Sequence, residues 1–167
     1  MDIKPYNTVC NFNPKWVDNG TCTLKLIARN RVRFNVDYDL FLPMKNVTIH
    51  LQFFKFYNQF RPFLMNDWAN LCSALSNISP YNFFIKTLLR QTTKYSNMNN
   101  CYHAVGVHYQ LRNADIPPQF FGLFMDPGKY KVELHVYEGY PYDTVGNWSV
   151  SFDISENFKK ISKSKKN

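Results

Sequence analysis

The sequence lacks the short motifs by which many enzymes and cofactor-binding proteins can be recognised. It has no glycine-rich phosphate-binding loop, no nucleophile-elbow motif around a serine and no C-x-x-C pair. Glycine is scarce, at 6 of 167 residues. No apolar run approaches the roughly 18 to 20 residues that span a bilayer. We therefore expect a non-enzymatic protein without a cofactor, a metal site or a transmembrane segment.

The N-terminal residues MDIKPYNTVC also lack the apolar stretch of a secretory signal peptide. Either the sequence begins at a mature start, or the protein is intracellular with free thiols. Two features favour a secreted, extracellular protein. The cysteines are even in number, as two disulfides require, and four glycosylation sequons begin at asparagines. The cysteines are Cys10, Cys22, Cys72 and Cys101, and the sequon asparagines are Asn19, Asn46, Asn77 and Asn147.

The net charge of +8 is concentrated at one end of the chain. Five lysines lie in the final stretch FKKISKSKKN, so the rest of the chain carries only +3. We expect a single domain over residues 1–157 and a basic, disordered tail over 158–167. A second basic group, Lys25, Arg29, Arg31 and Arg33, lies opposite the aromatic residues, so it offers no stacking surface for nucleic acid. It indicates a charged outer sheet face or a docking surface for anionic headgroups or a receptor.

Aromatic residues make up 17% of the chain, and many alternate with polar residues. The segment VRFNVDYDLFL places its apolar side chains at every second position, which puts them on one face of a strand. Residues 22–28, 47–53, 105–111, 130–136 and 148–154 alternate in the same way. Six such segments predict antiparallel sheets with one buried face each, in a sandwich or a barrel.

The middle of the chain has a helical period instead. In NDWANLCSAL the apolar residues recur at i, i+3, i+4 and i+7, with Asn66 or Asp67 available as an N-cap, and YNFFIKTLLRQ repeats the pattern. These segments predict a short helical insertion at about residues 66–95. Two irregular, proline-containing stretches, FRPFLMNDW and IPPQFFGLFMDPG, carry more aromatic residues and methionine than connections require, so we expect them to form a mouth or lid.

Polar candidates for chemistry all have a simpler explanation. His50, His108 and His135 fall on the polar phase of their strands, which predicts solvated histidines rather than metal ligands. Asp37 and Asp39 share a face with Arg33, which predicts an exposed charged face rather than acid–base catalysis. The apolar faces of the strands remain as the candidate functional feature. They could fill a solid core or line a ligand cavity.

The order of several segments resembles a family of secreted insect proteins. The segments are VCNFNPKW, GTCTLKLIARNR, NVTIHLQFFK, RPFLMN, LCSAL, YSNMNNC and IPP…DPGKYKVELHVY. This arrangement is similar to the family of unknown function that includes the CheA and CheB chemosensory proteins. The resemblance implies a fold like the ML lipid-recognition proteins, such as the ganglioside activator, in which an immunoglobulin-like sandwich admits a lipid. It also implies a role with hydrophobic cues such as pheromones or cuticular hydrocarbons.

We therefore predict an immunoglobulin-like antiparallel β-sandwich that binds a lipid or another long-chain hydrophobic ligand between its sheets. Cys10–Cys22 would tie a first hairpin, and Cys72–Cys101 would fasten the insertion to the following strand. The alternative is an extracellular interaction module with a filled core, which would serve a chemosensory receptor or channel as an accessory. The expected ligand-binding residues are Phe34, Val36, Tyr38, Leu51, Phe53, Trp68, Phe84, Leu88, Phe121 and Phe124.

Overall fold

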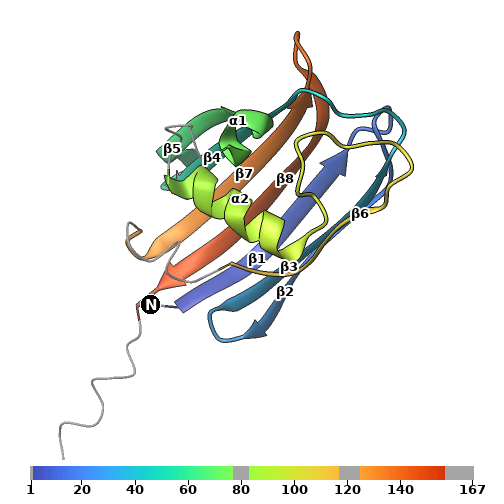
Figure 1. Ribbon diagram of the computed structural model, residues 1–167. Coiled ribbons are helices and arrows are strands. Elements are labelled where there is room, and N and C mark those ends of the chain that lie inside the picture. The colour runs from blue at the N-terminus through green and yellow to red at the C-terminus, as the bar shows by residue number, and fades with distance from the viewer. Residues whose placement is uncertain (1, 77–82, 117–124, 157–167) are drawn as a thin grey trace, which may run out of the picture.

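The computed structural model describes residues 2–76, 83–116 and 125–156, and within them the chain forms an antiparallel β-sandwich. One sheet has five strands in the order β1-β8-β7-β4-β5, and the other has three in the order β2-β3-β6. This architecture confirms the predicted fold class (Figure 1). The elements are β1 Asp2–Phe12, β2 Val17–Ala28, β3 Arg31–Leu40, β4 Val47–Phe56, β5 Phe60–Asn70, α1 Leu71–Leu75, α2 Phe83–Tyr95, β6 Tyr109–Ile116, β7 Gly128–Glu138 and β8 Asp143–Ser155.

Most of the alternating segments form strands with the expected buried face. In β3 the side chains of Val32, Phe34 and Leu40 are buried, and they alternate with polar residues on the outer face. In β8, Val150, Phe152 and Ile154 are buried in the same way. The period of two therefore locates the interior correctly in these strands.

The segment before β6 is an exception. The alternation over 105–111 predicts a strand there, but β6 begins only at Tyr109. Val105 and Val107 are exposed, and Gly106 lies between them with a φ of 85°. That left-handed backbone conformation suits a turn and interrupts an extended strand.

Two strands have no counterpart among the alternating segments. β1 pairs with β8 at one edge of the larger sheet, and β5 pairs with β4 at the other. The stretch FRPFLMN therefore belongs to strand β5 rather than to an irregular mouth. Residues 66–70 also belong to β5, so the helical region begins at Leu71, with Asn70 as the N-cap that accepts a hydrogen bond from the Ser73 amide at 3.2 Å.

The two helices lie across the inner face of the larger sheet, beside the smaller sheet (Figure 1). In α2, Ile85 and Leu89 are buried, and the Phe84 ring packs against Phe53 of β4 with centroids 5.8 Å apart. The helical period of this segment thus provides one apolar stripe that covers the part of the larger sheet that the smaller sheet leaves free. No helix in the described residues is long and apolar enough to cross a membrane.

Both predicted disulfide pairings are present, but one connects different elements than expected. Cys72–Cys101 joins α1 to the segment that precedes β6. Cys10 lies in β1 and Cys22 in β2, and these strands belong to different sheets. The Cys10–Cys22 bond therefore links the two layers of the sandwich across a Cα–Cα distance of 6.3 Å, and the prediction that it ties a hairpin is wrong.

Candidate functional site: an apolar cavity between the sheets

A cavity of about 240 Å³ lies between the two sheets and beneath the helices. All the layers of the fold contribute to its walls, and the surface of these walls is almost wholly apolar, although a few polar residues such as Thr92, His103 and Asn147 also border it. For comparison, an apolar cavity of roughly 150 Å³ stays dry and takes up small hydrophobic molecules. The lining residues used below are Cys10, Cys22, Phe34, Val36, Tyr38, Met44, Leu88, Met98, His103, Leu111, Ala114, Asp115, Leu134, Val136 and Trp148.

The buried apolar residues form two clusters rather than one continuous core. The larger cluster spans the five-stranded sheet, its helices and one end of the three-stranded sheet with Val17, Leu40 and Tyr109, whereas the smaller one comprises Phe34, Leu111 and Ala114. Most single domains have one contiguous core. The two sheets therefore pack together at the end that holds Val17, Leu40 and Tyr109, and residues of both clusters line the cavity.

A bulge in β6 contributes to the wall. Asn113 has a φ of 54°, and the register of β6 against β3 shifts at this point. Because of the extra residue, Leu111 and Ala114 both face inward although they are three positions apart. A regular strand would turn one of them outward, so the bulge gives the cavity two neighbouring wall positions.

The structure brings four of the predicted binding residues to the cavity. Phe34, Val36 and Tyr38 line it from β3, and Leu88 lines it from α2. The other described candidates do not line it. Leu51, Phe53 and Phe84 pack in the larger cluster, where Leu51 and Phe53 are almost fully buried. Phe121 and Phe124 lie outside the described residues.

Trp68 lies on the opposite side of the larger sheet from the cavity. Its side chain is 46% exposed and stacks on His50 with ring centroids 3.9 Å apart. The helical spacing of this segment predicted that Trp68 faces the interior, and this prediction is wrong because Trp68 belongs to strand β5. His50 is consequently buried, and its Nε2 lies 2.6 Å from Asn66 Oδ1, so the prediction of a solvated side chain is wrong for His50.

Sequence reasoning missed much of the wall. Trp148 of β8 packs against Phe34 with centroids 4.4 Å apart, and Leu134 and Val136 of β7 also line the cavity. All three residues occupy apolar positions of the alternating segments 130–136 and 148–154, so the sequence pattern could have identified them as inward-facing. Met98 and His103 come from the irregular segment after α2, where no period indicates which side chains face inward.

A small polar group borders the cavity near the end of β3. The Tyr38 hydroxyl donates to Met98 Sδ at 3.2 Å and lies 3.3 Å from His103 Nδ1. Burial raises the pKa of Tyr38 above its ordinary value. Burial also lowers the pKa of His103, which the nearby Asn100 carbonyl only partly opposes. Both side chains are therefore neutral at pH 7, and this end of the cavity carries no charge.

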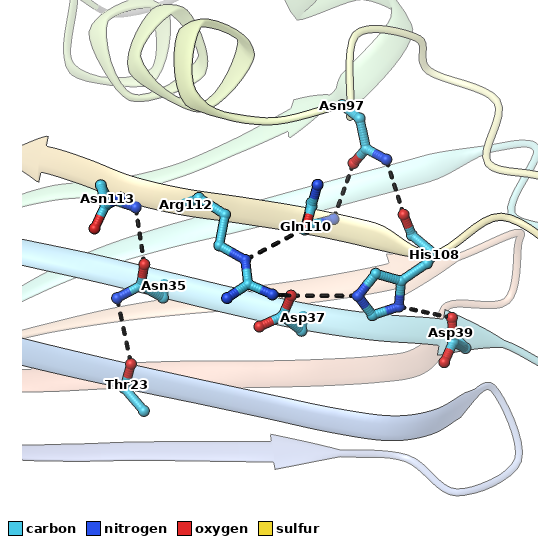
Figure 2. Close-up of polar contacts among 9 residues, drawn as sticks. All are labelled: Thr23, Asn35, Asp37, Asp39, Asn97, His108, Gln110, Arg112 and Asn113. Carbon is cyan, nitrogen blue, oxygen red and sulfur yellow. Dashed lines mark hydrogen bonds and ion pairs between the residues drawn. The ribbon is translucent and has the colours of Figure 1, made fainter.

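The segment that contains His103 is held in place from several sides. Met44 and His103 exchange two backbone hydrogen bonds of 2.9 Å. Asn97 donates to the His108 carbonyl at 2.8 Å and accepts from the Gln110 amide at 2.9 Å, as Figure 2 shows. Together with the Cys72–Cys101 bond, these contacts make the segment a fixed wall of the cavity.

The outer face of the smaller sheet carries a network of charged side chains (Figure 2). Asp37 accepts from Arg112 at 2.7 Å, and His108 lies between Asp37 and Asp39. The face is charged, as predicted for the two aspartates, and Asp39 is exposed, but the Asp37 side chain is only 18% exposed beneath its partners. The hydrogen bond to Asp39 raises the pKa of His108, and Asp37 adds to that effect.

The basic group on the same side of the molecule is largely paired. Arg29 forms an ion pair with Asp2, and Arg31 lies 3.0 Å from Asp115. Arg33 lies 3.7 Å from Asp115. The positive charge of these arginines is thus partly compensated within the fold.

The remaining predicted positions fall on the surface or outside the described residues. The sequon residues Asn19 and Asn46 are exposed, whereas Asn147 is half-buried and accepts a hydrogen bond from Asn11 at 3.1 Å. Asn77 and the lysine-rich tail lie outside the described residues. Residues 2–76, 83–116 and 125–156 contain no group of His, Cys, Asp or Glu side chains that could hold a metal ion.

Fold and cavity together define a disulfide-linked β-sandwich protein with an apolar chamber between its layers. A family model described as "Protein of unknown function (DUF1091)" matches residues 49–132, from β4 into β7, which is half of the chain. The chain therefore belongs to this family. No curated protein matches it. Because the family description assigns no activity, the functional proposal depends on the cavity.

Proposed function

We propose that this protein is a secreted, non-enzymatic carrier that reversibly binds a long-chain apolar molecule in the cavity between its sheets. The observation that supports the proposal most directly is the cavity of about 240 Å³ with almost wholly apolar walls. Its size is slightly below the roughly 300–1,000 Å³ typical of small-molecule pockets, which fits a slender chain better than a bulky ring system.

The physical driving force would be burial of the ligand's apolar surface. Each buried methylene group contributes about 0.8 kcal/mol, so a ligand gains affinity with every carbon until the cavity is full. The two disulfides fit a protein of an oxidising, extracellular compartment. The resemblance to the CheA and CheB proteins and to the ML lipid-recognition fold supports a role in perceiving hydrophobic cues such as pheromones.

A series of chain lengths tests this function. An apolar fluorescent dye is titrated into the delipidated protein and then displaced with alcohols of increasing length. We expect saturable binding of one dye per chain, and a displacement affinity that rises about fourfold for each methylene group before it levels off. Linear dye uptake without saturation, or no displacement by any alcohol, would refute the carrier function.

A blocking variant ties the binding to the cavity. Val36 lies in the wall between Phe34 and Tyr38, so Val36→Phe directs a ring into the space that the ligand would occupy. We expect at least tenfold weaker dye binding. The control is Val9→Phe in β1, since Val9 is 40% exposed and does not line the cavity. Equal binding by the two variants would place the dye elsewhere.

One observation favours the second candidate, an extracellular interaction module. Trp68 stacks with Tyr137 and Tyr142 at centroid distances of 5.5 and 5.6 Å, and Tyr140 lies beside Tyr142 with 87% of its side chain exposed. Exposed aromatic groups of this kind mark contact surfaces. The dye titration separates the two functions, because a module that uses only this outer surface gains nothing from an accessible interior.

A further inference from the structure

The cavity wall contains two buried nitrogen atoms without a hydrogen-bond partner among the described residues. One is Nε1 of Trp148, and the other is Nε2 of His103. Both residues line the cavity. Buried indole N–H groups normally have an acceptor, and burial without one is unfavourable. An unpaired donor in an otherwise apolar wall therefore points to an acceptor that the ligand brings.

Water is a poor substitute at this place. A buried water molecule normally makes about three hydrogen bonds to surrounding polar groups. Trp148 is surrounded by apolar side chains, with Phe34 packed on its ring at 4.4 Å and Leu134 opposite it on β7. A single water could satisfy the indole N–H but would leave its own remaining hydrogen bonds unmade.

The charges around the cavity restrict the acceptor further. The described residues that line it include no lysine and no arginine. Asp115 is the one acidic residue among them, and its carboxylate is paired with Arg31 and Arg33 on the outer face of the smaller sheet. A ligand carboxylate would enter an apolar space that offers no cation to pair with it, which is strongly unfavourable. A neutral oxygen incurs no such cost.

We infer that the ligand is a neutral oxygenated chain, such as an ester, a ketone or an alcohol, whose oxygen accepts a hydrogen bond from Trp148 Nε1. This inference rests on the proposed carrier function and specifies its ligand class, in which a neutral oxygenated chain binds more tightly than a pure hydrocarbon or an ionised fatty acid. His103 lies at the opposite end of the inward row on β3, beside Tyr38. Tyr38 is four positions along β3 from Phe34, the neighbour of Trp148, which is about 13 Å along a strand. A chain held at Trp148 therefore has room to extend toward His103.

The test compares dodecyl acetate, dodecane and dodecanoate at pH 8 on the wild-type protein and on Trp148→Phe. The phenyl ring keeps an aromatic wall but removes the N–H. We expect the variant to bind dodecyl acetate about five- to tenfold more weakly while its affinity for dodecane changes by less than twofold. We also expect dodecanoate to bind the wild-type protein at least tenfold more weakly than the acetate.

A spectroscopic measurement does not depend on the variant's folding. The chain has three tryptophans, Trp16, Trp68 and Trp148, which give three indole N–H signals in a ¹⁵N-correlated NMR spectrum. Dodecyl acetate should move the Trp148 signal downfield, as a new hydrogen bond requires, whereas dodecane should not. Trp16, whose Nε1 already donates to Asp143 at 3.0 Å, serves as the internal control.

The outcomes separate the inference from the proposed function. If dodecane binds and all three ligands move the Trp148 signal alike, or if Trp148→Phe weakens them equally, the inference is overturned and the carrier function stands. Tight binding of dodecanoate overturns the exclusion of anions. If none of the three ligands binds to the wild-type protein, the carrier function itself fails.

Discussion

Filling the cavity should stabilise the ligand-free protein, and Val36→Phe tests this directly. Val36 is half-buried in the central strand of the smaller sheet, between Cys22 on β2 and Leu111 on β6. Its side chain reaches the cavity, so a larger side chain has unoccupied space to enter. In a solid core the same change would force neighbouring side chains apart.

The size of the effect follows from the volume. Cavities destabilise proteins by about 24 cal/mol per Å³, so the whole 240 Å³ corresponds to roughly 6 kcal/mol. A phenyl ring that fills about a fifth of this volume would raise the free energy of unfolding by about 1 kcal/mol. For a chain of this size that is roughly 2–4 °C in the midpoint of thermal unfolding.

Val132→Phe is the matched control. Val132 also faces inward from a central strand, β7, but it is 5% exposed and lies next to Phe53 and Val150 in the solid cluster. Overpacking at this site should cost about 1–3 kcal/mol. The assay is urea unfolding of the delipidated proteins, followed by circular dichroism. If both variants lose similar stability, the space around Val36 is not a usable cavity.

Three further predictions concern other parts of the fold. Replacing Cys10 and Cys22 together by serine should lower the free energy of unfolding, measured in urea, by about 2.8 kcal/mol, which is the chain-entropy value for a sequence separation of 12. If the free energy of unfolding does not fall, the two layers are held together without this bond. Because contact with Asp39 raises the pKa of His108, its ion pairs stabilise the fold below the unfolded pKa of about 6.5, and this contribution is lost as the pH rises through the folded value. The stability difference between wild type and His108→Gln should therefore be largest at about pH 5 and vanish in alkaline solution. A histidine NMR titration should give a midpoint above 6.5, and a midpoint below it would contradict the contact. Trp68→Ala should cost about 0.5–1.5 kcal/mol of aromatic packing yet leave ligand affinity unchanged in the dye titration, and weaker binding would show that the outer face takes part.

Sequence periodicity predicted the central strands well because a buried face demands apolar residues at every second position. β3, β7 and β8 have that pattern, and their inward residues are buried or, where they line the cavity, half-buried. The edge strands β1 and β5 were missed because an irregularity interrupts the period in each: the register of β1 shifts between Pro5 and Asn7, and β5 is irregular between Pro62 and Asn66. In β5, Leu64 is even exposed, with a φ of 61°.

The binding site could be predicted only in part, for a related reason. Alternation shows which residues of β3 face inward, but it cannot show whether the opposite layer reaches them. Phe34 faces the cavity and Phe53 faces the Phe84 ring, although both occupy the inward phase of a strand. The difference arises from where α2 lies over the larger sheet, which depends on contacts between segments far apart in the chain.

The bond between Cys10 and Cys22 has a consequence for how the interior changes with its surroundings. It fixes the distance between the two layers where β1 and β2 meet, and Cys72–Cys101 fixes helix α1 to the segment that precedes β6. While both bonds are intact, they oppose separation of the layers, and under the proposed function this limits the thickness of a ligand. A reducing environment would cut both restraints together. The protein thus depends on oxidation for the dimensions of its interior as well as for its stability.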